Sequence, residues 1–125
     1  MNALDLARAA YARPGTPVRT ARAQEYDIIA QVTRRLRAAD RNRAEAYPAF
    51  AEALHDNMRL WTTLAADVAD PDNRLGRELR AGIVYLYEFT LRHSQRVLSD
   101  NAPVDVLIDL NTAVMRGLRG GGDDR

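Results

Sequence analysis

Apolar residues recur at intervals of three and four along most of this chain, which is the spacing of one face of an α-helix. The clearest series follows Pro48 and runs through Phe50, Leu54, Asn57, Trp61, Leu64 and Val68. Alternating runs of β-branched residues bounded by turns, which are typical of strands, are missing. The pattern therefore predicts an all-α fold, a single compact helical bundle of about five helices.

Proline and glycine positions divide the chain into these helices. We expect helices over about residues 2–12, 20–40, 48–68, 75–97 and 103–117, the last opening at Pro103 and stopping at Gly117. The fourth is apolar on more than one side around Val84, Tyr85 and Tyr87, which predicts a central helix. No internal repeat appears and the loops are short, so residues 1–118 are predicted to form one domain, followed by a flexible glycine-rich tail over residues 119–125.

Charge and cysteine content narrow the classes of function. The 125 residues carry 18 basic side chains, all arginine, against 17 acidic ones, so the formal net charge of +1 creates no long-range field for nucleic acid or an anionic membrane. Cysteine is absent, which excludes thiolate catalysis, iron–sulfur clusters and cysteine-based zinc sites and fits a reducing cytoplasm. No signal-peptide pattern and no membrane-spanning apolar run is present.

Catalytic and metal-binding signatures are also missing from the sequence. His55 and His93 fall on separate helices, and neither has a second histidine three or four residues away. Both are therefore expected to have structural or exposed roles, since a lone histidine commonly makes a local hydrogen bond. The serines Ser94 and Ser99 lack any flanking nucleophile motif, and no glycine-rich phosphate loop occurs. We therefore expect no enzymatic activity, no cofactor, no metal and no small-molecule substrate.

Arginines gather at the end of the second predicted helix and just beyond it. They are Arg34, Arg35, Arg37, Arg41 and Arg43. Such a cluster is able to contact RNA phosphates, but it also complements the carboxyl end of the helix dipole, and no aromatic residues are interleaved to stack bases. A solvated helix end is the favoured interpretation, and RNA binding stays the alternative.

Asn57 and Asn111 are the most informative polar residues, because both interrupt apolar series where an unpaired amide is costly. One interpretation is that they fix helix register, as a buried asparagine does in a coiled coil. The other is that they face a groove and bond an incoming peptide, with Trp61 and Met115 as apolar anchors. Trp61 also suits the core of a bundle of this size.

Several short motifs, taken in order, resemble the FlaF family of alphaproteobacterial flagellar biosynthesis regulators over nearly the whole chain. They are Ala10-Tyr11, Arg19-Thr20, Glu25-Tyr26, Thr33-Arg34-Arg35-Leu36, Ala53-Leu54, Asn57, Leu60-Trp61, Leu64, Asp67-Val68, Asp72-Asn73, Leu79-Arg80, Phe89-Thr90 and the run from Asn111 to Leu118. Their order and spacing together are more specific than any one of them.

The resemblance implies a small cytoplasmic helical protein needed for flagellin synthesis and secretion, which binds flagellin as a secretion chaperone and works beside the regulator FlbT. A purely structural bundle that associates with itself or with FlbT is a further alternative. A helical groove that covers the amphipathic segments of flagellin fits this role. We expect the third and fifth helices to form that groove. Its predicted contact residues are Asn57, Trp61, Asn111 and Met115, with Tyr11 and Tyr26 near the rim.

Overall fold

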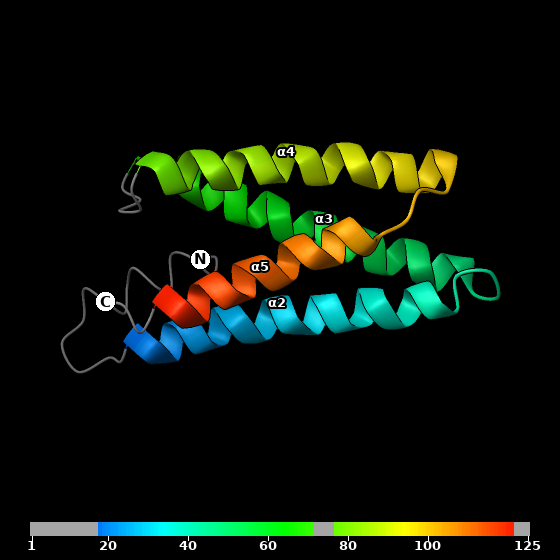
Figure 1. Cartoon of the computed structure of the whole chain (residues 1–125), viewed down its shortest axis with the longest axis horizontal. Coiled ribbons are helices and arrows are strands. Elements are labelled where there is room, and N and C mark those ends of the chain that lie inside the picture. Colours follow the sequence, from blue (N-terminus) through cyan, green and yellow to red (C-terminus); the bar gives the residue numbers. More distant parts are fainter. Residues whose placement is uncertain (1–17, 72–76, 122–125) are drawn as a thin grey trace.

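The computed structural model describes residues 18–71 and 77–121, which fold as a bundle of α-helices (Figure 1). These ranges contain four helices and no strand: α2 (Val18–Arg41), α3 (Tyr47–Ala69), α4 (Arg77–Asp100) and α5 (Asp105–Gly121). The all-α prediction is confirmed, with four helices in the described ranges instead of about five. The helix predicted over residues 2–12 lies outside the described residues.

The helices pack along three of the four sides of the bundle. Helix α2 packs against α3 and α5, and α3 also packs against α4, whereas α4 meets α5 at few positions. The ribbons of α4 and α5 diverge from their connection toward the opposite end of the bundle (Figure 1). Among the residues that the structure describes, the α4–α5 side is therefore the least closely packed, and we call it the open side.

This arrangement corrects the prediction that α4 is a central helix. Helix α4 packs against α3 and only briefly against α5, and no packing joins it to α2 within the described ranges. Val84 is 37% exposed and Tyr85 is 61% exposed. Apolar residues all round a helix predict burial, but here part of that surface faces solvent.

The tightest core lies toward the end of the bundle that holds the α2–α3 and α4–α5 connections. Its members come from all four helices and the connection before α5: Leu36, Phe50, Ala53, Leu54, Val97, Val104 and Leu107. Each was apolar at helical spacing, so burial of one face per helix supplies the driving force for this packing.

Helix ends follow the sequence signals in some places and not in others. Pro48 lies in the first turn of α3, as predicted, since its missing N–H needs no partner there. Helix α5 begins at Asp105, after Pro103, and the N–H groups of Leu107 and Ile108 both donate to the Val104 carbonyl. The prediction that α5 stops at Gly117 is wrong.

Gly117 continues the helix because its backbone does not take the left-handed conformation that ends one. That conformation appears instead at Asn101, where φ is 57° directly after α4. Asparagine tolerates it better than most residues, and the Ala102 N–H donates to the Arg96 carbonyl to close the turn.

Within the described ranges, no helix has both the length and the apolar content needed to cross a bilayer.

Candidate partner-binding surface

A buried hydrogen-bonded cluster joins three helices near the middle of the bundle. Asn111 of α5 accepts from the Trp61 indole N–H at 2.9 Å, and its amide nitrogen donates to Asn57 Oδ1 at 2.7 Å and to Thr33 Oγ1 at 3.0 Å. Thr33 in turn donates to the Ile29 carbonyl at 2.7 Å. The cluster therefore links α2, α3 and α5 through one amide.

The cluster supports the interpretation of Asn57 and Asn111 as register residues. Both asparagines are fully buried and Trp61 is 1% exposed. A one-residue slip of α5 would separate the Asn111 amide from its partners, and each buried group left unpaired costs about 1–3 kcal/mol. In this conformation the three side chains do not reach the surface. Their binding to a partner stays a prediction that requires the bundle to open.

Three buried polar atoms of α3 and α4 have no hydrogen-bond partner: Asn57 Nδ2, Thr90 Oγ1 and Ser94 Oγ. All three residues are fully buried. Unpaired buried polar atoms weaken the packing of the elements that carry them. Thr90 and Ser94 of α4 are therefore less fully hydrogen-bonded than the Asn111 side chain, which bonds to three partners.

Tyr26 and Met115 occupy more open positions than the other predicted contact residues. Both are half-buried. Helices α2 and α5 are antiparallel, so moving from Thr33 to Tyr26 and from Asn111 to Met115 leads toward the same end of the bundle (Figure 1). It is the end at which α4 and α5 diverge. Tyr11 lies outside the described residues.

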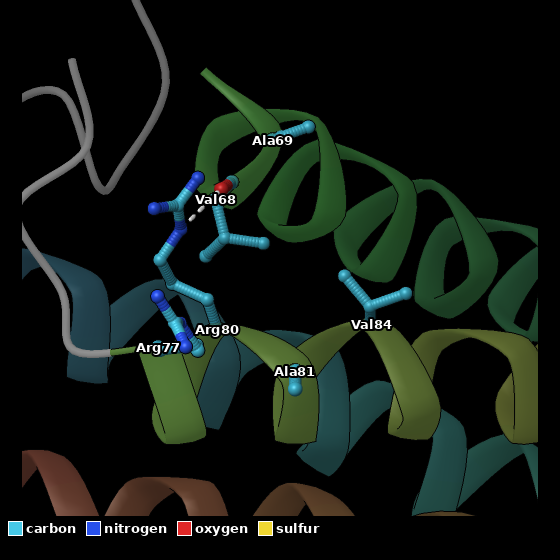
Figure 2. A pocket seen from close by; sticks show the side chains of 6 residues that line it. All are labelled: Val68, Ala69, Arg77, Arg80, Ala81 and Val84. Carbon is cyan, nitrogen blue, oxygen red and sulfur yellow. Dashed lines mark hydrogen bonds between the residues drawn. The ribbon is translucent and has the colours of Figure 1, made fainter. Parts of the chain in front are cut away.

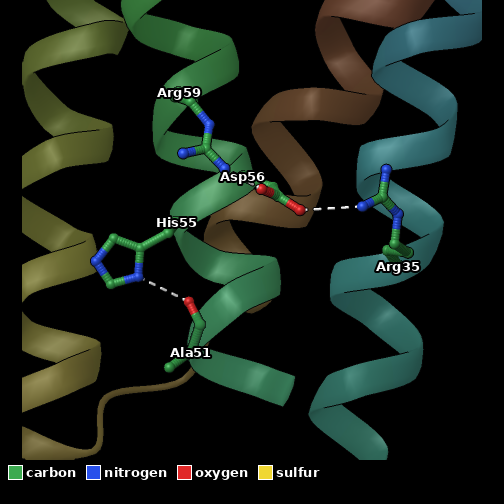
Figure 3. Close-up of polar contacts among 5 residues, drawn as sticks. All are labelled: Arg35, Ala51, His55, Asp56 and Arg59. Carbon is green, nitrogen blue, oxygen red and sulfur yellow. Dashed lines mark hydrogen bonds and ion pairs between the residues drawn. The ribbon is translucent and has the colours of Figure 1, made fainter. Parts of the chain in front are cut away.

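The arginines predicted to form one cluster have different environments. Arg34, Arg37 and Arg41 are exposed. Arg35 forms an ion pair with Asp56 of α3 at 3.0 Å, and Asp56 also pairs with Arg59 (Figure 3). An exposed pair of this kind stabilises a fold by no more than about 1 kcal/mol.

Arg43 is a structural residue that the sequence pattern did not distinguish from its neighbours. Its guanidinium lies 4.3 Å from the centre of the Phe50 ring and donates to the carbonyl of Ala102 at 3.1 Å and that of Val97 at 3.5 Å. The Val97 carbonyl is in the last turn of α4, where carbonyls lack intrahelical partners. Arg43 therefore ties the α2–α3 loop to the carboxyl end of α4.

Both histidines make the local hydrogen bonds that were expected of them. His55 Nδ1 lies 2.8 Å from the Ala51 carbonyl (Figure 3), and His93 Nε2 lies 2.7 Å from the Pro103 carbonyl. The His93 ring also stacks on Phe89 with the ring centres 5.7 Å apart. Among the residues that the structure describes, no group of three or more histidine and acidic side chains is placed to hold a metal ion.

A shallow hollow of about 370 Å³ lies between the end of α3 and the start of α4 (Figure 2). Its lining is mostly apolar, with two guanidiniums at one side: Val68, Ala69, Arg77, Arg80, Ala81 and Val84. The side chains of Val68 and Val84 project into the space between the two helices in Figure 2. Arg80 is held in place because its Nε donates to the Val68 carbonyl at 2.9 Å.

The sequence of the chain matches a known protein family. The family model described as "Flagellar protein FlaF" matches residues 7–118. The chain belongs to the FlaF family. The match covers the helices that carry the Asn111 cluster, the open side and the hollow. It makes this chain a flagellar protein. No curated protein and no solved structure matches the chain.

Proposed function

We propose that this FlaF chain is a regulatory protein of flagellar biosynthesis, needed for flagellin synthesis and secretion, which binds flagellin in the cytoplasm as a secretion chaperone. Family membership supports the flagellar role. The open α4–α5 side is the observation that carries the binding role. The proposal includes no catalytic step and no cofactor, and FlbT is a second proposed partner.

The properties of flagellin, the proposed client, explain why an open side would be useful. The terminal segments of flagellin are amphipathic and become filament core only on assembly, so before export their apolar stripes need cover. A helix-binding surface covers such a stripe through a few apolar anchors at helical spacing. Within residues 18–71 and 77–121, the four helices leave one side incompletely packed, and that side offers a place for one more helix.

Half-buried apolar side chains line the two diverging helices. They include Ile83 and Leu86 on α4 and Leu110, Val114 and Met115 on α5. Methionine suits a surface that receives clients of varied sequence, because its unbranched side chain adapts its shape. We place the flagellin helix along this side, with Met115 as an anchor and Tyr26 near the end of the contact.

The buried Asn111 cluster then acts as support instead of contact. It holds α5 against α2 and α3 through bonds to Thr33, Asn57 and Trp61. A rigid α5 presents Met115 in one position, which lowers the ordering cost of binding. The asparagines thus serve the proposed function by holding the surface that contacts the client.

Co-expression with flagellin followed by size-exclusion chromatography tests the proposal. The wild-type chain should elute with flagellin, and Met115→Glu should reduce the co-eluting fraction at least fivefold while far-UV circular dichroism stays helical. Ile28→Glu is the matched control, since Ile28 is an apolar residue of α2 that is 42% exposed. An equal loss of the co-eluting fraction in both variants would refute the assigned surface. The absence of a complex with the wild-type chain would refute the function.

Salt dependence separates this function from RNA binding through Arg34, Arg35, Arg37 and Arg41. Each phosphate neutralised on an RNA single strand contributes about 0.7 to the slope of log affinity against log salt, whereas apolar anchoring changes little. The flagellin complex should persist between low and moderate salt. A tight complex with flagellin messenger RNA that weakens steeply with salt and is lost in Arg34→Gln with Arg37→Gln would favour the RNA alternative.

A further inference from the structure

An exposed stripe on α4 combines an apolar centre with opposite charges at its two ends. Along the helix it contains Arg77, Ala81, Val84 and Glu88, spaced by four, three and four residues, with Tyr85 beside it. This spacing places the four residues on one face. All of them are exposed, and Tyr85 is 61% exposed. We call these five residues the α4 stripe.

The centre of the α4 stripe is unusual for the solvent face of an outer helix. Residues 81–87 contain no charged side chain, and the hollow beside Ala81 and Val84 extends the apolar surface onto α3. Solvent-facing positions of an amphipathic helix are normally polar. Among the described residues, no ion pair joins Arg77 or Glu88 to another side chain. Both ends of the stripe thus have charge available for a partner.

The order of charges selects the partner. If a second α4 lies antiparallel with its centre between Ala81 and Val84, Arg77 of each copy faces Glu88 of the other, and Ala81 faces Val84. A parallel arrangement would instead place arginine on arginine and glutamate on glutamate, which is repulsive. A two-fold axis requires one patch to be complementary to itself, and this stripe meets that requirement.

We propose that the α4 stripe is a dimer interface, in which the α4 helices of two copies of this chain pack antiparallel through the Ala81–Val84 centre and two Arg77–Glu88 ion pairs. The surface goes beyond the proposed function, because Ile83 and Leu86 of the flagellin surface lie on another face of α4. A dimer built this way leaves both open sides available. One helix pair buries less area than a typical stable interface, so the dimer is expected to be in equilibrium with monomer at concentrations on the order of micromolar.

Reciprocal charge exchange tests the ion pairs on the full chain by sedimentation equilibrium. Arg77→Glu and Glu88→Arg should each weaken the dimer about tenfold. The double variant carries both changes in every copy, so each pair is restored in reverse, and its dimer should return to within about threefold of wild type. Arg37→Glu, at an exposed position on α2, should leave the dimer unchanged.

Cysteine pairing tests the orientation, because the chain contains no cysteine of its own. Under mild oxidation, a mixture of Arg77→Cys and Glu88→Cys chains should form a disulfide-linked heterodimer faster than either variant links to itself. Faster self-linking of each variant would indicate parallel helices and overturn the arrangement. A wild-type chain that stays monomeric at several hundred micromolar, or a double charge variant as weak as the worse single one, would overturn the dimer.

Tyr85→Ser separates failure of this inference from failure of the proposed function. Its dimer should weaken about tenfold while its co-elution with flagellin is unchanged. If Tyr85→Ser no longer co-elutes with flagellin and the wild-type chain never dimerises, the α4 stripe would instead be a flagellin-binding surface. Dimerisation without any flagellin complex would leave this inference standing and refute the function.

Discussion

The indole N–H of Trp61 donates to Oδ1 of Asn111 across 2.9 Å, joining two helices whose bonded residues are 50 positions apart. The same asparagine uses its amide nitrogen for Asn57 and Thr33. One buried amide thus forms hydrogen bonds with polar groups of both α2 and α3. The bundle is therefore held in register by hydrogen bonds as well as by shape.

Asn111→Ala should lower the free energy of unfolding by about 2–4 kcal/mol. The substitution leaves the Trp61 N–H and Asn57 Oδ1 buried without their partner and opens a small cavity. Urea denaturation followed by circular dichroism measures the change, with Gln31→Ala at an exposed position of α2 as the control. A loss under 0.5 kcal/mol, as is usual for surface changes, would mean that the cluster does not fix the register.

Arg43→Met should cost about 1–3 kcal/mol, because it removes the donors to the Val97 and Ala102 carbonyls as well as the charge over Phe50. Arg43→Lys should recover only part of this, since an ammonium group lacks the planar fork of guanidinium. Arg37→Met, at an exposed position, should be nearly neutral. If Arg43→Met and Arg37→Met had equal midpoints in urea, the assigned role of Arg43 would be wrong.

Gly82→Ala should raise the stability of the monomer by about 1 kcal/mol. Gly82 lies inside α4, and a Cβ added there meets nothing within 4 Å, so the change gains helix propensity without a clash. Thermal unfolding is measured on dilute protein, at a concentration too low for the dimer to form, so that the change in melting temperature reports on the monomer alone. Gly117→Ala in α5 meets the same conditions and should act in the same direction, whereas a drop in melting temperature for either would contradict the assigned helix.

Asn101→Gly should be tolerated, while Asn101→Val should destabilise the chain by about 1–2 kcal/mol. The residue has φ of 57°, a conformation that glycine adopts freely and that β-branched residues avoid. Equilibrium unfolding of the two variants compares them directly. Equal stability of the glycine and valine variants would show that the turn after α4 does not depend on this conformation.

Helical spacing was enough to predict the class of fold and the approximate position of each described helix. It also identified Asn57 and Asn111 as polar residues within apolar series. Spacing could not show that they bond to each other and to Trp61, because that contact joins α3 to α5 across a long sequence separation. Their role in register was distinguishable from a surface role only after their burial was known.

The error about α4 has a physical cause. Apolar residues on several sides of a helix indicate that several sides are covered, but they do not identify what covers them. Among the described helices, only α3 and a short part of α5 cover α4, and Val84 and Tyr85 remain exposed. The prediction that α5 ends at Gly117 was wrong for a similar reason, because glycine is compatible with a helix end without requiring one.

The candidate surface was the least predictable feature. Met115 and Tyr26 are half-buried at one end of the bundle, whereas three of the residues grouped with them lie in the interior. Arg43 resembles its exposed neighbours in sequence and differs only because the α2–α3 loop brings it onto Phe50 and the end of α4. Such distinctions depend on tertiary contacts that no local pattern contains.

Isothermal titration of purified flagellin subunits into the chain at moderate salt determines whether this FlaF chain binds flagellin. We expect a saturable binding curve with one flagellin per chain, a negative heat-capacity change from apolar burial, and little change in affinity when the salt is raised. Met115→Glu should weaken the binding, and Ile28→Glu should not. A flat titration with folded wild-type protein at concentrations of tens of micromolar would contradict the claim that this FlaF chain binds flagellin.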